Sequence, residues 1–130
     1  MDVTKGPGEI ARGAMAAVQA GDRDAWLASF AETARVEDPV GHVPPMAGRE
    51  ALAQFWDMGV APLADATFEV TREWEAGDEV MLLATVSITT STGVAASYDG
   101  AFNYTVDADS RISLLRAFWD LPSVAAALAG

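Results

Sequence analysis

The sequence contains no cysteine and only one histidine, His42. Without cysteine the chain has no disulfide, thiolate nucleophile or thiolate metal ligand, and a single histidine excludes a multi-histidine metal centre. No apolar run approaches the roughly 20 residues that a membrane-spanning helix requires. The first eight residues also lack the apolar segment of a secretory signal. We therefore expect a cytoplasmic protein that needs no metal ion and no other cofactor.

Basic residues are scarce as well, with 8 Lys and Arg against 19 Asp and Glu, which gives a formal net charge of −11. Because such a charge repels phosphate backbones and anionic lipid, we expect no nucleic-acid partner and no membrane partner. Apolar residues, in contrast, are plentiful and make up 51% of the 130 residues. This length suits one domain with a single core, which we place at residues 1–130.

Helix signals dominate the first half of the chain. Apolar residues recur at helical spacing up to residue 20, and Gly21 marks the end of that helix. Asp22 offers an N-cap to a second short helix, whose apolar stripe runs from Trp26 to Phe30. A short strand is expected at 35–38, and a third helix at 49–58 ends before Gly59.

Strand signals dominate the second half. Apolar and polar residues alternate after Pro62, and this pattern predicts one strand that ends at the Gly77-Asp78 turn and three more at 80–90, 94–106 and 112–120. The alanine-rich tail at 121–130 suits a short helix. The predicted fold is α+β, with three N-terminal helices packed on a curved antiparallel or mixed sheet. A sheet curled against helices can enclose an apolar pocket for a small hydrophobic molecule.

One stretch, Ala34 to His42, carries the clearest candidate for chemistry. It places Glu37 and Asp38 side by side before Pro39, and their opposite strand parity predicts that one carboxylate faces the pocket and the other faces water. Parity alone leaves open which one points inward. Asp38 is either a turn residue or a general base whose pKa is raised by burial. His42 is read as an exposed loop residue.

The strand at 94–106 offers polar groups on both of its faces. Tyr98 and Tyr104 share parity with Phe102 on the apolar, inward face, where their hydroxyls can donate to a ligand. Asp99 has the opposite parity and faces solvent unless a bulge intervenes. The four tryptophans are assigned to packing, and the pairs Phe55-Trp56 and Phe118-Trp119 can each divide between core and pocket wall.

Four segments together resemble the Δ5-3-ketosteroid isomerases of the NTF2-like (SnoaL-like) superfamily. They are Ala20-Gly21-Asp22-Arg23-Asp24-Ala25-Trp26-Leu27, Val36-Glu37-Asp38-Pro39-Val40-Gly41, Gly48 to Trp56 and Leu115-Arg116-Ala117-Phe118-Trp119-Asp120. The resemblance implies a cone-shaped barrel with a deep apolar pocket and a homodimer formed through the sheet. It also implies that Asp38 is the general base for proton transfer on a steroid. The aromatic residues expected to contact the ligand are Phe30, Trp56, Phe102, Tyr104 and Trp119.

The oxyanion hole of those enzymes, a tyrosine and a protonated aspartic acid, is not matched. Ala14 and Phe102 stand where the two donors are expected. Loss of one such donor costs on the order of 10²–10³ in rate, so a substitute is needed, for which Asp99, Tyr98 and Tyr104 are the candidates. The alternatives are a non-catalytic steroid-binding protein and a SnoaL-type cyclase or hydratase. Epoxide opening would require a second carboxylate and an arginine, for which Asp120 and Arg116 are the nearest candidates.

Overall fold

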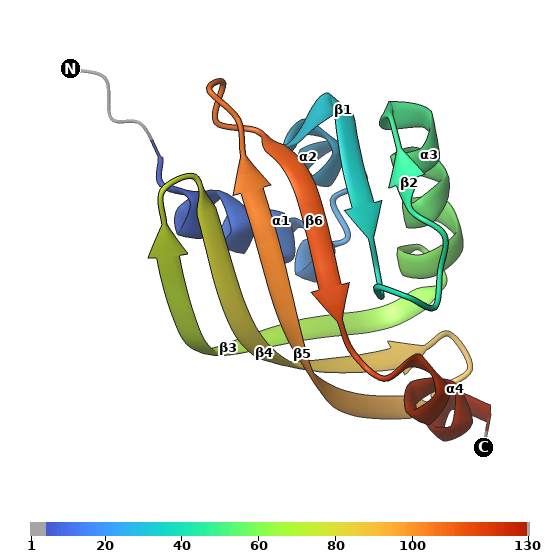
Figure 1. Ribbon diagram of the computed structural model, residues 1–130. Coiled ribbons are helices and arrows are strands. Elements are labelled where there is room, and N and C mark those ends of the chain that lie inside the picture. Colours follow the sequence, from blue (N-terminus) through green and yellow to red (C-terminus); the bar gives the residue numbers. More distant parts are fainter. Residues whose placement is uncertain (1–4, 130) are drawn as a thin grey trace.

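The computed structural model describes residues 5–129, which form one curved sheet with helices on its concave side (Figure 1). The helices are α1 (Pro7–Ala20), α2 (Arg23–Ala28), α3 (Arg49–Phe55), the π-helical turn η1 (Trp56–Val60) and α4 (Leu121–Ala129). The strands are β1 (Phe30–Glu37), β2 (Met46–Ala47), β3 (Leu63–Ala76), β4 (Glu79–Thr90), β5 (Ala95–Val106) and β6 (Ile112–Phe118). The predicted α+β class is confirmed.

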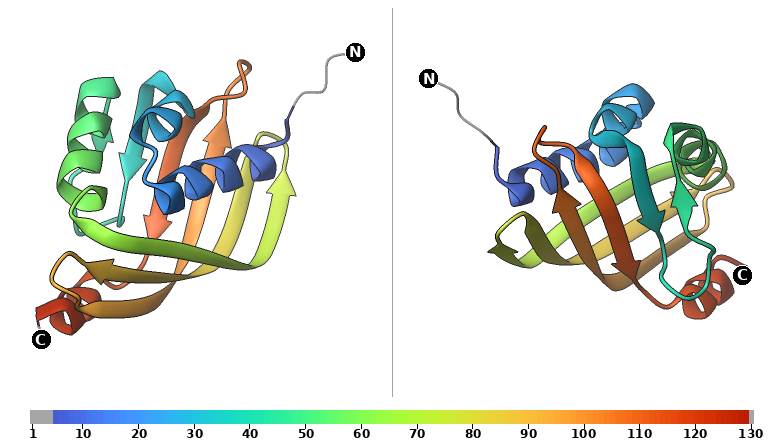
Figure 2. Two further views of the ribbon diagram at one scale, coloured as in Figure 1. Left: turned by 180° about the vertical axis from the view of Figure 1, so that it is seen from behind. Right: turned by 45° about the horizontal axis from the view of Figure 1, so that its top comes forward.

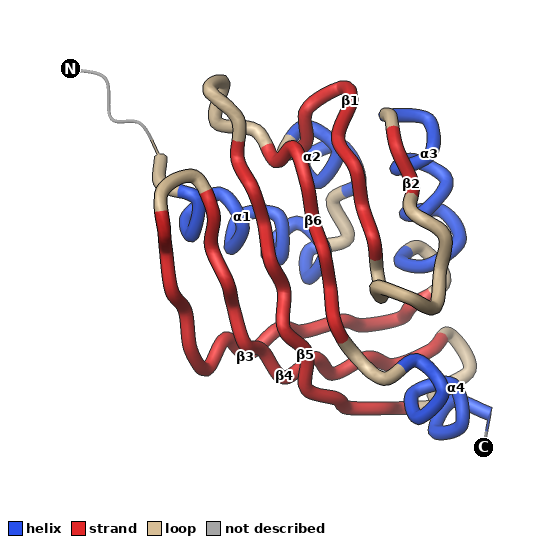
Figure 3. The backbone as a smooth tube through the Cα atoms, in the orientation of Figure 1, coloured by secondary structure: helices blue, strands red, loops and turns tan. Residues whose placement is uncertain are grey.

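The sheet is mixed and has the strand order β2-β1-β6-β5-β4-β3. Only β1 and β6 pair in parallel, and this pairing brings the end of β1, where Asp38 follows, beside the C-terminal end of β6. The long strands β3, β4 and β5 bend along their length, so that the sheet forms a concave shell without closing (Figure 3). Helices α1, α2 and α3 lie on the concave side, while α4 covers the end of the sheet where β5 begins (Figure 2).

The predicted end of the first helix and the predicted start of the second are confirmed. Gly21 adopts a left-handed conformation with φ 67° and ends α1. The carboxylate of Asp22 accepts a hydrogen bond of 3.1 Å from the backbone N–H of Ala25, and so caps α2. The third helix ends earlier than predicted, at Phe55, because the chain widens there into η1.

Other element boundaries differ from the sequence prediction. Phe30 was predicted to belong to the second helix, but it is the first residue of strand β1. The last strand, β6, ends two residues before Asp120, where the prediction had placed its end. The two-residue strand β2 was not predicted. The tail forms α4, which raises the number of α-helices from three to four within residues 5–129; residue 130 lies outside the described residues.

Trp74 is exposed rather than packed in the core. The pairing of β3 with β4 shifts between Val70 and Arg72, which is the signature of a β-bulge. A bulge reverses which side chains face the core, so Trp74 turns to the outer face, where 47% of it is exposed and the Arg72 guanidinium lies 4.7 Å from its ring centre. The carboxylate of Glu73 forms an ion pair with Arg12 of α1.

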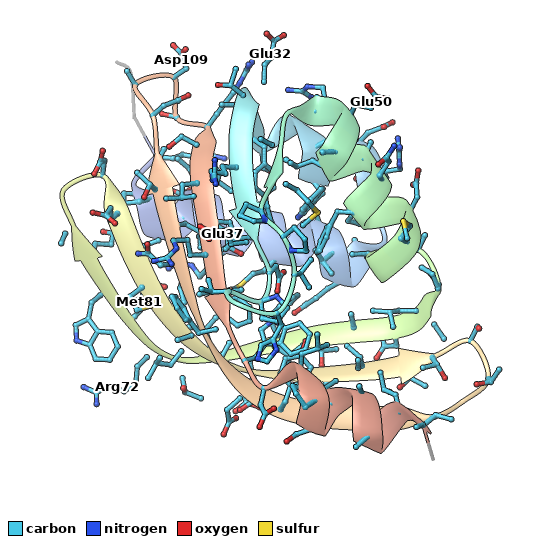
Figure 4. The ribbon with its side chains drawn as sticks, turned by 45° about the vertical axis from the view of Figure 1, so that its right-hand side comes forward. Glu32, Glu37, Glu50, Arg72, Met81 and Asp109 are labelled. Atoms are coloured by element: carbon cyan, nitrogen blue, oxygen red, sulfur yellow. The ribbon has the colours of Figure 1, made fainter. Side chains whose placement is uncertain are left out.

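The core lies between the helices and the concave face of the sheet. Its fully buried large side chains include Phe30, Leu52, Leu82 and Ile112. No charged residue of the described chain is fully buried in it. Glu32, Glu50 and Asp109 project from the end of the molecule opposite α4 (Figure 4). None of the helices within residues 5–129 is long and apolar enough to cross a membrane.

Candidate functional site

A cavity of about 390 Å³ lies between the concave face of the sheet and the helices. Its walls are mainly aliphatic and aromatic, which is typical of a small-molecule site. Helix α1, the turn η1 and helix α4 all contribute to it, together with the inward faces of β3, β4, β5 and β6. The apolar residues of the wall include Met15, Val18, Phe55, Val60, Phe68, Val86, Ile88, Leu115 and Val124.

Asp38 is the only carboxylic acid among the described residues that line this cavity. Glu37 points the other way and accepts a hydrogen bond of 3.0 Å from Nε of Arg116. The predicted opposition of the two carboxylates is thus confirmed, and the question that parity left open is answered in favour of Asp38. The reason is pairing with β6, because Glu37 is in register with Arg116 on the outer face of the sheet.

The carboxylate of Asp38 has one hydrogen-bond donor within the described residues. The indole N–H of Trp119 donates to Oδ1 of Asp38 over 2.6 Å. Burial raises the pKa of Asp38 above its ordinary value, and the Trp119 hydrogen bond opposes that rise. The Trp119 hydrogen bond therefore fixes the orientation of the Asp38 carboxylate, and burial makes this carboxylate a stronger base than that of an exposed aspartate.

Two phenols share the cavity with Asp38. Tyr98 and Tyr104 both line it, as their strand parity predicted. Burial raises the pKa of each hydroxyl, and the negative charge of Asp38 raises it further. Both tyrosines therefore stay protonated at neutral pH and can donate a hydrogen bond. The ring of Tyr98 packs against that of Trp119, with centroids 4.9 Å apart.

The two positions where the resemblance implies oxyanion donors do lie at the cavity. Ala14 and Phe102 are both part of its wall, and neither side chain has a polar atom to offer. Asp99 is not brought to this site. It is exposed on the outer face of the sheet, where its carboxylate accepts a hydrogen bond of 2.7 Å from the hydroxyl of Thr85. No bulge reverses β5 at this point, since the β4–β5 register is continuous from Glu79 to Thr89.

The aromatic residues expected at the ligand divide into two groups. Phe102, Tyr104 and Trp119 line the cavity, whereas Phe30 and Trp56 do not and are 1% and 4% exposed. Their rings pack around Trp26, at 4.6 Å and 5.6 Å between centroids. Phe55 lines the cavity where Trp56 was expected, because consecutive residues of a helix point in different directions.

Four wall residues in α4 were not predicted. They are Leu121, Val124, Ala125 and Leu128, and their spacing of three and four residues is the signal that marks them as one helical face. The other polar candidates stay outside the cavity. Arg116 pairs with Glu37, Asp120 accepts a hydrogen bond of 2.8 Å from the hydroxyl of Ser123 at the start of α4, and His42 is exposed in its loop.

Comparisons with known proteins agree with this architecture. The Δ5-3-ketosteroid isomerase from Mycobacterium sp. superimposes with a TM-score of 0.84 at 28% identity, over 91% of this chain and 96% of that one. RV0760c from Mycobacterium tuberculosis, solved in complex with estradiol-17β-hemisuccinate, gives 0.83 at 25% identity, over 91% and 97%. The epoxide hydrolase/cyclase-like enzyme SalBIII, which acts in pyran ring formation in salinomycin, shares the fold at 24% identity, with a TM-score of 0.80 over 89% and 92%.

A search of curated protein sequences found no match. The family model of the SnoaL-like domain matches residues 11–115, which include Asp38, both tyrosines and most of the cavity wall. The chain belongs to the SnoaL-like domain family and has its NTF2-like fold.

Proposed function

We propose that the protein transfers a proton on a flat, apolar ketone of the steroid type, with Asp38 as the general base. The observation that carries this proposal is a single carboxylic acid among the described residues of a mainly apolar cavity that two tyrosines also line. A general base works best when its pKa is brought toward the pH of the reaction, and burial moves the pKa of Asp38 in that direction.

The reaction follows from these groups. Asp38 takes the proton from the carbon between the ketone and an isolated double bond, which leaves a dienolate whose negative charge collects on the former ketone oxygen. A tyrosine hydroxyl donates a hydrogen bond to that oxygen and lowers the energy of the charged state. Asp38 then returns the proton two carbons away, and the double bond becomes conjugated with the ketone.

Of the two possible donors we favour Tyr104. Asp38 lies beside Ala117, because the N–H of Val40 donates to the Ala117 carbonyl over 2.8 Å, and Ala117 is in register with Phe102. Tyr104 lies two residues from Phe102 along β5 and Tyr98 lies four, which is roughly 7 Å and 13 Å of strand. The proposed oxyanion donor thus stands one inward-facing position from the place where the isomerases carry theirs.

The relatives support the choice of ligand. One structural neighbour at 28% identity is a Δ5-3-ketosteroid isomerase, and another at 25% holds a steroid ester. A hydrolytic or epoxide-opening reaction is less well supported, because no arginine and no second carboxylate lie among the described residues of the cavity wall.

We also propose that two copies associate through the outer face of the sheet. That face carries Trp74 and Phe118, which are 47% and 41% exposed. Large exposed apolar side chains on a sheet are typical of an interaction surface.

The test is the rate of isomerisation of a β,γ-unsaturated ketosteroid, followed by the absorbance of the conjugated product. We expect Asp38→Asn to abolish turnover, and Tyr104→Phe to lower kcat by about 10²–10³ while Tyr98→Phe lowers it less. Asp99→Asn, on the outer face, serves as the matched control and should retain the wild-type rate. Absence of turnover by the wild-type protein would exclude isomerase activity.

A non-catalytic steroid-binding protein is the second candidate. It is favoured by Ala14 and Phe102, which leave the usual oxyanion positions without a donor. Trp119 reports on this directly, since a steroid in the cavity should quench its fluorescence. Quenching at micromolar steroid without turnover would support binding alone, and absence of quenching would count against both candidates.

A further inference from the structure

Helix α4 contributes one of its faces to the wall of the cavity. Leu121, Val124, Ala125 and Leu128 all line it, and they form a single face at helical spacing. Val124 is the most deeply inserted of them, with 6% of its surface exposed. The opposite face of the helix is made of small residues that are exposed to solvent.

This wall lies at one end of the cavity. The inward face of β5 runs from Ala96, in register with Ile88, to Tyr104, in register with Val80. Helix α4 packs against β5 at the end where that strand begins, as all views show (Figures 1 and 2). Ala14 and Met15 also line the cavity, and they belong to α1, which packs on β3, β4 and β5 away from α4 (Figure 1). A flat ligand that places its ketone near Tyr104 therefore extends toward α4.

Apolar contact alone holds α4 in this position. Within residues 121–129, the side-chain hydrogen bonds are those of Ser123 with the carboxylate of Asp120, which cap the start of the helix. No hydrogen bond or ion pair joins a side chain of this segment to the sheet or to another described helix. The same apolar side chains that dock the helix would thus contact the far end of a ligand.

We propose that Val124 and Leu128 determine how long a ligand the cavity accepts, so that α4 selects the ligand while Asp38 and Tyr104 act on its ketone. The proposal rests on the cavity being the ligand site put forward above. Its physical basis is packing: an added methylene group gains about 0.8 kcal/mol when it finds apolar space and loses that gain when a side chain already fills the space.

The test compares two ligands that share a ring ketone and differ at the far end, androstenedione and the longer progesterone, by quenching of tryptophan fluorescence. We expect Leu128→Ala and Val124→Ala each to improve the affinity for progesterone relative to androstenedione by about tenfold, which is the effect of burying two carbon atoms. Leu128→Trp should shift the ratio the other way. Leu128 is in the last turn of α4 and is only partly buried, so this variant changes the wall and leaves the fully buried core residues untouched.

Met15→Ala is the matched control, because it enlarges the cavity by a similar volume where α1, not α4, forms the wall. A ratio that responds to Met15→Ala and not to the α4 variants would overturn the proposal, as would a ratio that changes less than twofold in all of them. The same comparison with Prodan and Laurdan, two fluorescent ketones with a short and a long acyl chain, separates the two proposals. If these probes show the α4 effect and no steroid binds, the steroid proposal fails and the role of α4 stands. If none of the four ligands binds, both fail.

Discussion

At the scale of single residues, the site depends on how Asp38 is buried. Among residues 5–129 the carboxylate has one hydrogen-bond donor, the indole of Trp119, and it faces a cavity whose wall is mainly apolar. An ionised carboxylate is poorly stabilised in such a place, and for this reason its pKa is raised. Residues that serve catalysis are often held in conditions that do not favour folding.

We therefore expect Asp38→Asn to make the folded protein more stable at neutral pH. The raised pKa means that the folded state binds its proton more tightly than the unfolded chain does, so ionisation of Asp38 lowers stability as the pH rises through the folded-state pKa. Asparagine cannot ionise and its carbonyl still accepts from Trp119. In thermal unfolding from pH 3 to pH 8, the variant should have a higher Tm than the wild-type protein at the upper end of this range. The difference should disappear when the pH falls below the ordinary pKa of an aspartate. Asp99→Asn, which is exposed, should show no such trend; an equal gain at every pH would contradict this explanation.

At the scale of elements, local signals set the helix ends while pairing set the faces of the strands. Gly21 and Asp22 stop one helix and start the next through contacts within a few residues. The outward turn of Trp74 has a different origin, since it depends on a bulge in the pairing of β3 with β4. The alternation in the sequence continues through that bulge and gives no sign of it.

The cap on α2 provides a test at this scale. We expect Asp22→Ala to lower the free energy of unfolding by about 1 kcal/mol, because the N–H of Ala25 loses its acceptor. Chemical denaturation with urea measures the change. Asp24→Ala is the control, because it removes a charge from the first turn of the same helix and no capping hydrogen bond. It should lower the free energy of unfolding by less than half as much. Equal losses in the two variants would show that charge near the helix start matters more than the cap.

At the scale of the whole molecule, the two faces of the sheet differ in what they contact. The concave face and the helices enclose the cavity, while the outer face exposes Trp74 and Phe118 beside the arginines that lie over their rings. The net charge of −11 favours separation of the molecules in solution. A dimer through this face has to bury enough apolar surface to overcome that repulsion.

We expect the wild-type protein to elute as a dimer and Phe118→Glu to shift it toward the monomer, because a carboxylate would then be buried in the interface. Light scattering after size exclusion at tens of micromolar protein measures the mass. Met58→Glu is the control: Met58 is 81% exposed on η1, away from the sheet, and its replacement should leave the mass unchanged. A wild-type protein that is monomeric under these conditions would rule out the proposed dimer.

Much of the fold could be predicted from the sequence because it is encoded by neighbouring residues. The α+β class, the helix ends at Gly21 and Asp22 and the inward parity of Tyr98 and Tyr104 all follow from spacing along the chain. The opposition of Glu37 and Asp38 follows in the same way, since successive strand residues point to opposite faces.

What only the tertiary structure decided is which of these groups meet. Pairing of β1 with β6 turned Asp38 inward and set Trp119 against it, across 81 positions of sequence. Phe30 and Trp56 pack around Trp26 and do not line the cavity, and the docking of α4 adds its apolar face to the cavity wall. These outcomes depend on contacts between distant segments, whose energies no local pattern records. The sequence by itself determined which side chains of an element share a face, because that follows from local spacing. The pairing and packing of the elements determined which face turns inward and which side chains share a cavity.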